Sequence, residues 1–319
     1  MGIELVKSEF TIKNKRIDIG HIPETGALAL TGVGVCMPLI MIVSAFAALV
    51  GNGGAPRASI FMGKGDKESA EQTLGNCFTT QIVVSLLLTL ILFTGNKSFL
   101  MAFGASENTI PYAVAYMNIY SLGTIFVQLT LGMNAFITAQ GFAKTSMLSV
   151  LVGAASNIIL DPIMIFGLFG FPKMEVAGAA LATVTGQIVS MILAFYFNIK
   201  RNTELDLNMR GFRPNRSIIA VIYEVGVPSI IMQSIGSVMV FGMNKILLMF
   251  SSTATAVFGV YFKLQSFVFM PVFGLNNGMI PIIAYNYGAR NKKRILSTIR
   301  LSTGIAIAIM MVGLAGFQL

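Results

Sequence analysis

Charged residues are scarce in this chain. Of its 319 residues only 11% are charged and 55% are hydrophobic, whereas about 25% of the residues of a soluble domain are charged. This composition excludes an ordinary soluble domain and is typical of a membrane protein. The net charge of +9 predicts no nucleic-acid partner, because the 22 basic residues cluster in short segments between apolar runs.

Cysteine and histidine are nearly absent. The two cysteines, Cys36 and Cys77, lie in or beside apolar segments without the spacing of a disulfide framework or a metal site. The single histidine, His21, lies in a polar stretch and is interpreted as a solvated loop residue. A membrane enzyme would need several His, Asp or Ser groups at one membrane depth, so we expect neither an enzyme nor a resident cofactor.

Long apolar runs are abundant. Runs of about twenty residues can cross a hydrocarbon core of about 30 Å as helices. The sequence contains eight such runs: residues 27–62, 75–94, 110–139, 145–168, 175–199, 217–250, 253–287 and 297–319. It therefore predicts an all-α polytopic membrane protein with about eight transmembrane helices. Runs 27–62 and 253–287 contain glycine and proline well inside, which predicts kinked or extended helices.

Basic residues fix the expected orientation of these helices. The loops after the first, third, fifth and seventh runs hold fourteen Lys and Arg residues, and the intervening loops hold two, Lys97 and Lys173. Short cytoplasmic loops are enriched in Lys and Arg, so we expect the first set on the cytoplasmic side of a bacterial inner membrane. Residues 1–26 break the alternation because they carry four basic residues. We expect this atypical tail to replace a first helix.

Two parts of the sequence resemble each other at an offset of 225 residues. Eleven identities occur within forty-five positions, and they include Gly53 with Gly278 and Gly63 with Gly288. Matching glycines and prolines carry the most weight, because these residues fix backbone geometry. Five spans separate the two copies, so both copies run in the same direction and predict a parallel repeat.

The repeat predicts a division into two lobes. Residues 27–199 would form an N-lobe of five helices, and residues 217–319 a partial C-lobe of three. Residues 200–216 would form a basic cytoplasmic linker between them. If the lobes are equal, one helix is missing at the start and about three at the end, so we expect an incomplete chain.

One acidic residue lies deep within an apolar run. Asp161 precedes Pro162 in SNIILDPIMIFG, and a carboxylate in a span costs at least about 2.5 kcal/mol on insertion scales. Asn157 lies one helical turn earlier on the same face, and Pro162 frees the backbone carbonyl of Ile158. These oxygens suit Na⁺ or a proton relay, so we predict a coupling-ion site, with Na⁺ as a candidate metal, at Asp161 and Asn157. The alternative is a carboxylate held in a permanent hydrogen-bond network.

Neighbouring helices offer further polar groups. Thr183 is a third candidate for the ion site, although Asn157 and Thr183 could equally be packing residues. A second set of polar residues is predicted to line a cavity: Asn134, Gln128, Gln187 and Lys263. For Lys263 the alternative is snorkelling along its helix to the membrane surface.

Five ordered stretches carry a family resemblance. They are IGHIPETGALALTGVG, GNGGAPRASIFMGKGDKESAEQTLGN, SNIILDPIMIFG, EVAGAALATVTGQ and FKLQSFVFMPVFGLNNGMIPIIAYNYGARNKKR. Together they resemble the multidrug and toxic compound extrusion (MATE) transporters, most closely the bacterial branch with DinF-like and MepA-like proteins. The resemblance implies twelve helices in two six-helix lobes around a cavity, with Na⁺ or H⁺ influx driving the export of small organic cations.

The resemblance also defines departures and alternatives. The chain looks like helices two to nine of twelve, and Asp18 does not take the role of the carboxylate in the relatives' first helix, because it lies among basic residues. We expect a monomer whose partners are the lipid bilayer and its substrates. The alternatives are a lipid-linked sugar flippase of the same superfamily, for which a more basic cavity would be expected, and a non-functional remnant.

Overall fold

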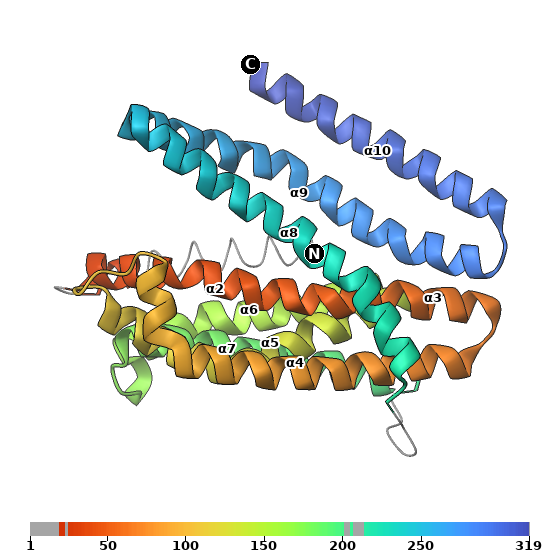
Figure 1. Cartoon of the computed structure of the whole chain (residues 1–319), viewed down its shortest axis with the longest axis horizontal. Helices are drawn as coiled ribbons and strands as arrows, with labels where there is room; N and C mark the ends of the chain where they lie inside the picture. Colours follow the sequence, from red (N-terminus) through yellow and green to blue (C-terminus); the bar gives the residue numbers. More distant parts are fainter. Residues whose placement is uncertain (1–18, 23–24, 201–204, 207–213, 319) are drawn as a thin grey trace.

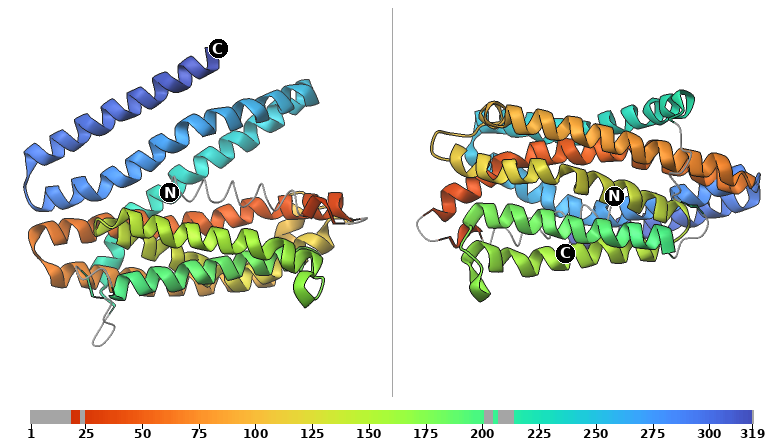
Figure 2. Two further views of the ribbon diagram at one scale, coloured as in Figure 1. Left: turned by 180° about the vertical axis from the view of Figure 1, so that it is seen from behind. Right: turned by 90° about the horizontal axis from the view of Figure 1, so that it is seen from below.

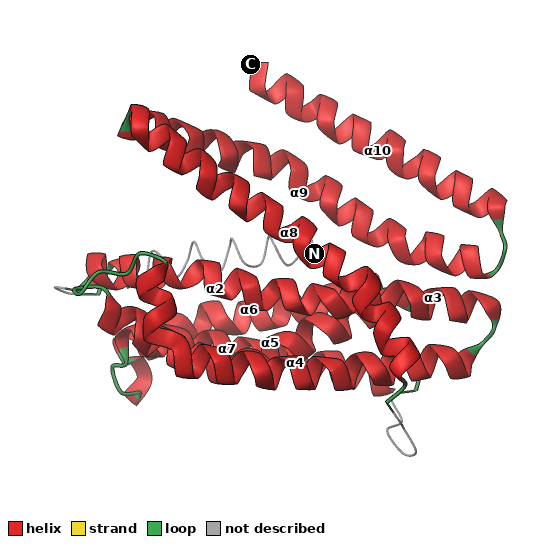
Figure 3. Ribbon diagram, in the orientation of Figure 1, coloured by secondary structure: helices red, strands yellow, loops and turns green. Residues whose placement is uncertain are grey.

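The computed structural model is a helical protein (Figure 1). It describes residues 19–22, 25–200, 205–206 and 214–318. Figure 3 shows that this part of the chain consists of helices joined by loops. The elements are α2 (Gly26–Gly53), α3 (Ala55–Lys64), α4 (Lys67–Ala102), α5 (Ile110–Ala139), α6 (Ala143–Phe166), the short 3-10 helix η1 (Leu168–Gly170), α7 (Glu175–Lys200), α8 (Arg216–Phe250), α9 (Ser252–Gly288) and α10 (Lys292–Gln318).

The helices follow the predicted apolar runs. Seven helical segments in the described residues are long and apolar enough to cross a membrane, and α8, with 35 residues, corresponds to the remaining predicted run. The run 27–62 divides at Gly54 into α2 and α3, with Pro56 in the first turn of α3, as its glycines and proline predicted. The predicted boundaries 75–94 were too short, because the 36-residue helix α4 continues into the polar sequence on both sides.

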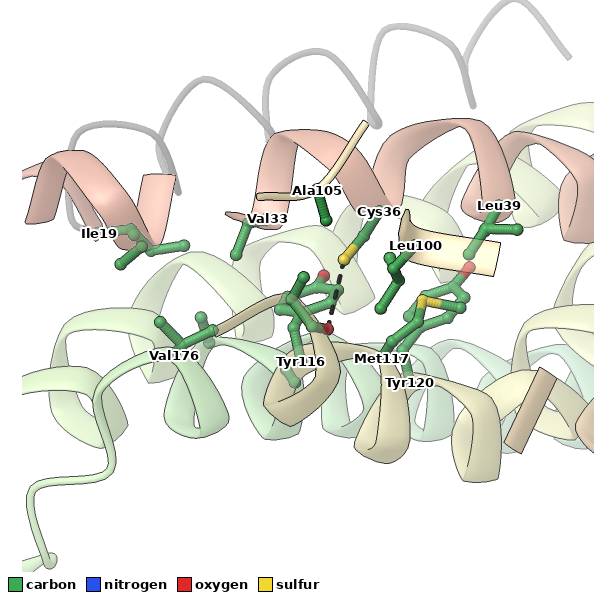
Figure 4. Packing of buried hydrophobic residues seen from close by; sticks show 14 of the residues in the cluster. Ile19, Val33, Cys36, Leu39, Leu100, Ala105, Tyr116, Met117, Tyr120 and Val176 are labelled. Carbon is green, nitrogen blue, oxygen red and sulfur yellow. Dashed lines mark hydrogen bonds between the residues drawn. The ribbon is translucent and has the colours of Figure 1, made fainter. Parts of the chain in front are cut away.

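A five-helix bundle contains the N-terminal half. Its central helix is α5, which packs against α2, α4, α6 and α7 (Figures 1 and 2). Figure 4 shows Tyr116 and Tyr120 of α5 meeting Cys36 and Leu39 of α2 in the buried core. The Cys36 thiol donates a hydrogen bond of 3.5 Å to the backbone carbonyl of Ala113. The cysteines are free and buried, which places them in the core.

The helices α8, α9 and α10 form a second layer inclined to this bundle. They approach it where α8 packs against α2 and α9 crosses α3, and they diverge from it toward the turn between α8 and α9 (Figures 1 and 2). Most of the predicted tail 1–26 and much of the linker 200–216 lie outside the described residues, so those two predictions, and with them the proposed division into lobes, stay predictions.

The repeat is visible residue by residue in two turns. Gly65, between α3 and α4, and Arg290, between α9 and α10, both have left-handed backbone conformations, with φ of 76° and 56°. The next residue caps the following helix in each case: the Asp66 side chain accepts a hydrogen bond from the Ser69 amide at 3.0 Å, and Asn291 accepts one from the Arg294 amide at 3.1 Å. All of these partners are related by the offset of 225 residues.

The two copies of the repeat touch each other where α3 crosses α9. A Cβ added to Gly63 would collide with the backbone carbonyl of Tyr285, and a Cβ added to Gly288 would collide with that of Ile60. Ile60 and Tyr285 are themselves related by the offset of 225 residues. The contact is therefore reciprocal, as expected for two units related by a twofold axis, and only glycine allows the backbones to lie this close.

Candidate ion site between helices α5, α6 and α7

The helix α6 brings Asp161 and Asn157 together as its sequence spacing predicts. The Asn157 side-chain amide donates a hydrogen bond of 3.3 Å to Asp161 Oδ1. Asp161 is 0% exposed and Asn157 is 3% exposed, so both groups are in the interior of the bundle. Pro162 lies inside the helix and cannot donate the backbone hydrogen bond that Ile158 would otherwise accept.

Two glycines allow α7 to lie directly against this part of α6. A Cβ added to Gly186 of α7 would lie 2.6 Å from the carbonyl oxygen of Gly153 and 3.0 Å from Cβ of Asn157. A Cβ added to Gly153 would lie 2.5 Å from the carbonyl oxygen of Gly186. These close approaches exclude larger side chains and hold the backbone of α7 beside Asn157.

The third helix, α5, contributes Tyr116. Its hydroxyl group lies 3.4 Å from Oγ1 of Thr183, within hydrogen-bond distance, and the side chain is close enough to Asp161 to interact with it electrostatically. Tyr116 is 2% exposed. The structure thus pairs Thr183 with Tyr116, a residue that the sequence analysis did not single out. The available signal was the pair Tyr116 and Tyr120, one turn apart in an apolar run, which was not distinguished from packing.

The groups around Asp161 are hard oxygen donors. Asn157 Oδ1 is buried and has no hydrogen-bond partner within the described part of the chain, which leaves an amide oxygen next to the carboxylate. The hydroxyl groups of Thr183 and Tyr116 lie on the neighbouring helices α7 and α5, and Thr183 donates to the carbonyl of Ala179 at 2.9 Å. Such a set fits Na⁺ or a proton, because both prefer oxygen and neither needs a soft ligand. This fit rests on the chemistry of the oxygen atoms alone.

Two of the predicted cavity-lining residues make hydrogen bonds between helices. Gln128 is fully buried, and its amide donates to the carbonyl of Val43 at 2.8 Å. Asn134 accepts a hydrogen bond of 2.7 Å from Ser149. These contacts join helices α2, α5 and α6 and are of the kind that holds membrane helices together, at about 0.6 kcal/mol each.

Gln187 and Lys263 complete the predicted set. The backbone carbonyl of Gln187 accepts a hydrogen bond of 3.1 Å from Thr130, which joins α7 to α5. Lys263 belongs to α9, but its side chain lies outside the part of the chain that the structure describes. The cavity-lining role of all four residues stays a prediction.

Comparisons with known proteins identify the family. The sequence model of the MatE family matches residues 16–163 and 228–316. The chain is similar to the multidrug export protein MepA of Staphylococcus haemolyticus (strain JCSC1435), with 29% identity over 273 residues. That match covers 85% of the chain and 59% of the relative, so the chain spans well under two thirds of the length of this curated relative.

Solved structures show the same fold. A crystal structure of a MATE protein in a bent conformation superposes with a TM-score of 0.90 and 25% identity, over 99% of the chain and 69% of the other protein. A multidrug resistance MATE transporter in an outward-facing conformation gives a TM-score of 0.88 at 24% identity, over 100% of the chain and 70% of that protein. The predicted resemblance and the all-α polytopic membrane fold are thereby confirmed: the chain belongs to the MatE family, whose members are transporters.

Proposed function

We propose that the chain serves cation-coupled export of small organic cations, with Asp161 as the group that binds the coupling Na⁺ or proton. The single observation behind this proposal is the fully buried carboxylate, which is 0% exposed and accepts a hydrogen bond from Asn157 at 3.3 Å. A carboxylate that is removed from water favours uptake of a proton or of a cation.

Several residues would bind the ion together with Asp161. Asn157 Oδ1 and the carboxylate offer oxygens from one helix face, and Thr183 offers one from α7. Tyr116 would position Thr183 through their 3.4 Å contact. When a proton is the coupling ion, Asp161 itself carries it, and the same neighbours stabilise the neutral carboxyl group by hydrogen bonding.

The arrangement of the two helical layers supports alternating access. The layers are joined by the reciprocal contact of Gly63 and Gly288 and diverge toward the other end (Figure 2). The joined end carries the basic loops that we assign to the cytoplasm. Asp161 lies in the last two turns of α6, a helix that ends at Phe166, and therefore near the diverging, outer end. We infer that this arrangement corresponds to the outward-open state of a protein in a bacterial inner membrane.

The names of the relatives support the export of drugs, and the proposal of organic cations as substrates rests on the acidic group. Relatives of this chain are named multidrug export proteins. In the proposed exchange Na⁺ or H⁺ enters the cell while an organic cation leaves it, and one buried acidic group serves both movements. The transport activity is proposed for a monomer in the bilayer, and the identity of its drugs is left open.

An efflux measurement tests this proposal. Bacterial cells without their own multidrug pumps would express the chain, be loaded with ethidium, and be followed by fluorescence under imposed Na⁺ or pH gradients. We expect efflux that depends on one of the two gradients and that Asp161→Asn abolishes. Thr31→Ala is a matched control, because Thr31 is an exposed polar residue of α2 whose hydroxyl donates to Ala27 of the same helix at 2.9 Å. Gradient-independent efflux, or unimpaired efflux by Asp161→Asn, contradicts the proposal.

A further inference from the structure

The turn between α9 and α10 carries an unusual concentration of positive charge. Residues 289–296 contain four basic residues and no acidic one: Arg290, Lys292, Lys293 and Arg294. All four are exposed. They lie in the turn that follows α9 and in the first turn of α10, and this turn is at one corner of the molecule (Figure 1).

The repeat provides an internal control for this charge. The related turn, residues 64–71, has the same backbone conformation and the same capping hydrogen bonds, yet it contains two basic and three acidic residues. In that turn Lys67 pairs with Glu71 at 3.5 Å and with Asp206 at 3.4 Å. The backbone therefore does not require the positive charge at the second turn, and folding of the turn does not explain it.

The ion pairs of the described residues do not include these four basic residues. The sequence contains no Asp or Glu after Glu224, so neither α9 nor α10 can supply an acidic partner. The ion pairs found among the described residues join Lys67 to Glu71 and Asp206, and Lys173 to Glu175. Four exposed cations that make no ion pair among the described residues favour an anionic partner from outside the chain.

The position of the turn selects the kind of partner. Directly after the four basic residues, α10 continues as a 27-residue helix long and apolar enough to cross a membrane. Tyr287, which is 66% exposed, and Leu296, which is 54% exposed, flank the charged groups. Tyrosine is enriched at the boundary between headgroups and hydrocarbon, and basic clusters next to a membrane helix attract anionic lipids.

We propose that Arg290, Lys292, Lys293 and Arg294 form a binding site for the phosphate headgroup of an anionic phospholipid. The guanidinium and ammonium groups would bind the phosphate oxygens, while Tyr287 and Leu296 contact the upper part of the acyl chains. The site lies at the end of the molecule where α3 and α9 meet, so a bound lipid would hold the start of α10 at the membrane surface. It is separate from the site at Asp161, and its test requires no transport.

A residue exchange between the two turns tests the site. The variant Lys293→Glu/Arg294→Ser introduces the residues found at the equivalent positions Glu68 and Ser69, which this backbone accepts, and it keeps the Asn291 cap. The purified chain in nonionic detergent is titrated with phosphatidylglycerol or phosphatidylcholine, and bound lipid is counted by native mass spectrometry. We expect the chain to bind phosphatidylglycerol selectively and the exchange to weaken binding about a hundredfold, at about fivefold for each unit of charge removed.

A charge-matched variant separates a local site from the general charge of this face. Lys144→Glu/Lys200→Ser removes the same amount of charge from exposed positions at the same end of the bundle, and we expect it to leave the affinity nearly unchanged. Circular dichroism checks that both variants remain helical. Raising NaCl from about 0.05 M to about 0.5 M must weaken lipid binding to the unmodified chain, which gives a test that needs no variant.

Three results would overturn the proposal. One is phosphatidylglycerol binding that is as tight in the exchange variant as in the unmodified chain, or that is weakened as much in the charge-matched variant as in the exchange variant. Another is lipid binding that persists at high salt. The third is displacement of the lipid by inorganic phosphate at equal concentration, which would identify a site for a soluble anion.

Discussion

Replacing Gly288 with alanine should open the joined end of the two helical layers. The added Cβ would collide with the carbonyl oxygen of Ile60, and it would lie 2.9 Å from the carbonyl carbon of that residue and 3.2 Å from that of Gly63. These are backbone atoms, which cannot rotate away as a side chain can. The helices α3 and α9 must therefore separate at their crossing to accommodate the methyl group.

The size of this effect follows from the cost of overpacking. Forcing one extra methyl group into a close contact costs about 1–3 kcal/mol, and each 1.4 kcal/mol changes an equilibrium about tenfold. The population in which α3 and α9 are apart should rise by a factor of roughly 5 to 150. Alanine also stabilises a helix relative to glycine by about 0.5–1 kcal/mol. A control variant with the same exchange is therefore needed to separate this effect from the collision.

Gly278→Ala supplies that control, because Gly278 lies in the same helix and an added Cβ there meets no atom within 4 Å. Spin labels at Lys64 and Ala289, in a background without the native cysteines, report the distance across the crossing by double electron–electron resonance. We expect Gly288→Ala to increase the long-distance population and Gly278→Ala to leave it unchanged. Identical distance distributions for the two variants would refute the role of the glycine contact in closure.

Three further predictions concern the ion site and the first turn of the repeat. Tyr116→Phe removes the contact with Thr183 and should weaken Na⁺ or proton binding by roughly 2- to 12-fold, because one hydrogen bond contributes about 0.5–1.5 kcal/mol; an unchanged affinity in a binding titration would contradict this. Gly186→Ala places a methyl group 2.6 Å from the Gly153 carbonyl oxygen and should lower the free energy of unfolding by about 1–3 kcal/mol, measured by denaturant titration against Gly278→Ala. Hydrogen bonds from Ser69 lower the pKa of Asp66 below its usual 3.8, so its contribution to stability is present above pH 3.8 and is lost as the pH falls through the lowered pKa. Asp66→Asn, which copies the cap at Asn291, should remove that part of the acid dependence of the melting temperature, and an unaltered acid dependence would count against the cap.

Much of the fold could be predicted from the sequence because the membrane imposes strong rules. A helix in a bilayer must be long and apolar, so the run 110–139 gave the bounds of α5 (Ile110–Ala139) without error. The bounds of α4 were wrong, because a helix can continue into water, where composition no longer marks its end. The repeat was visible because glycine and proline mark places where the backbone is constrained.

The candidate site was predictable only along one helix. The spacing of Asn157 and Asp161 fixes their contact through helix geometry alone. The contribution of Tyr116 depends on how α5 packs against α7, and that information is spread over many glycine and alanine contacts rather than held in a motif. The same limit applies to Gln128 and Asn134, whose hydrogen bonds between helices could not be predicted from their positions in the sequence.

The most direct test of the account is whether Asp161 binds a cation within the folded chain. The melting temperature of the purified chain is measured across Na⁺ concentrations at fixed pH, with choline keeping the ionic strength constant, and across pH without Na⁺. A cation bound only by the folded chain raises the melting temperature as its concentration rises. We predict stabilisation by Na⁺ or by acid in the unmodified chain, and the loss of that stabilisation in Asp161→Asn. Equal stabilisation of both proteins, or no response of the unmodified chain to either cation, would contradict the account.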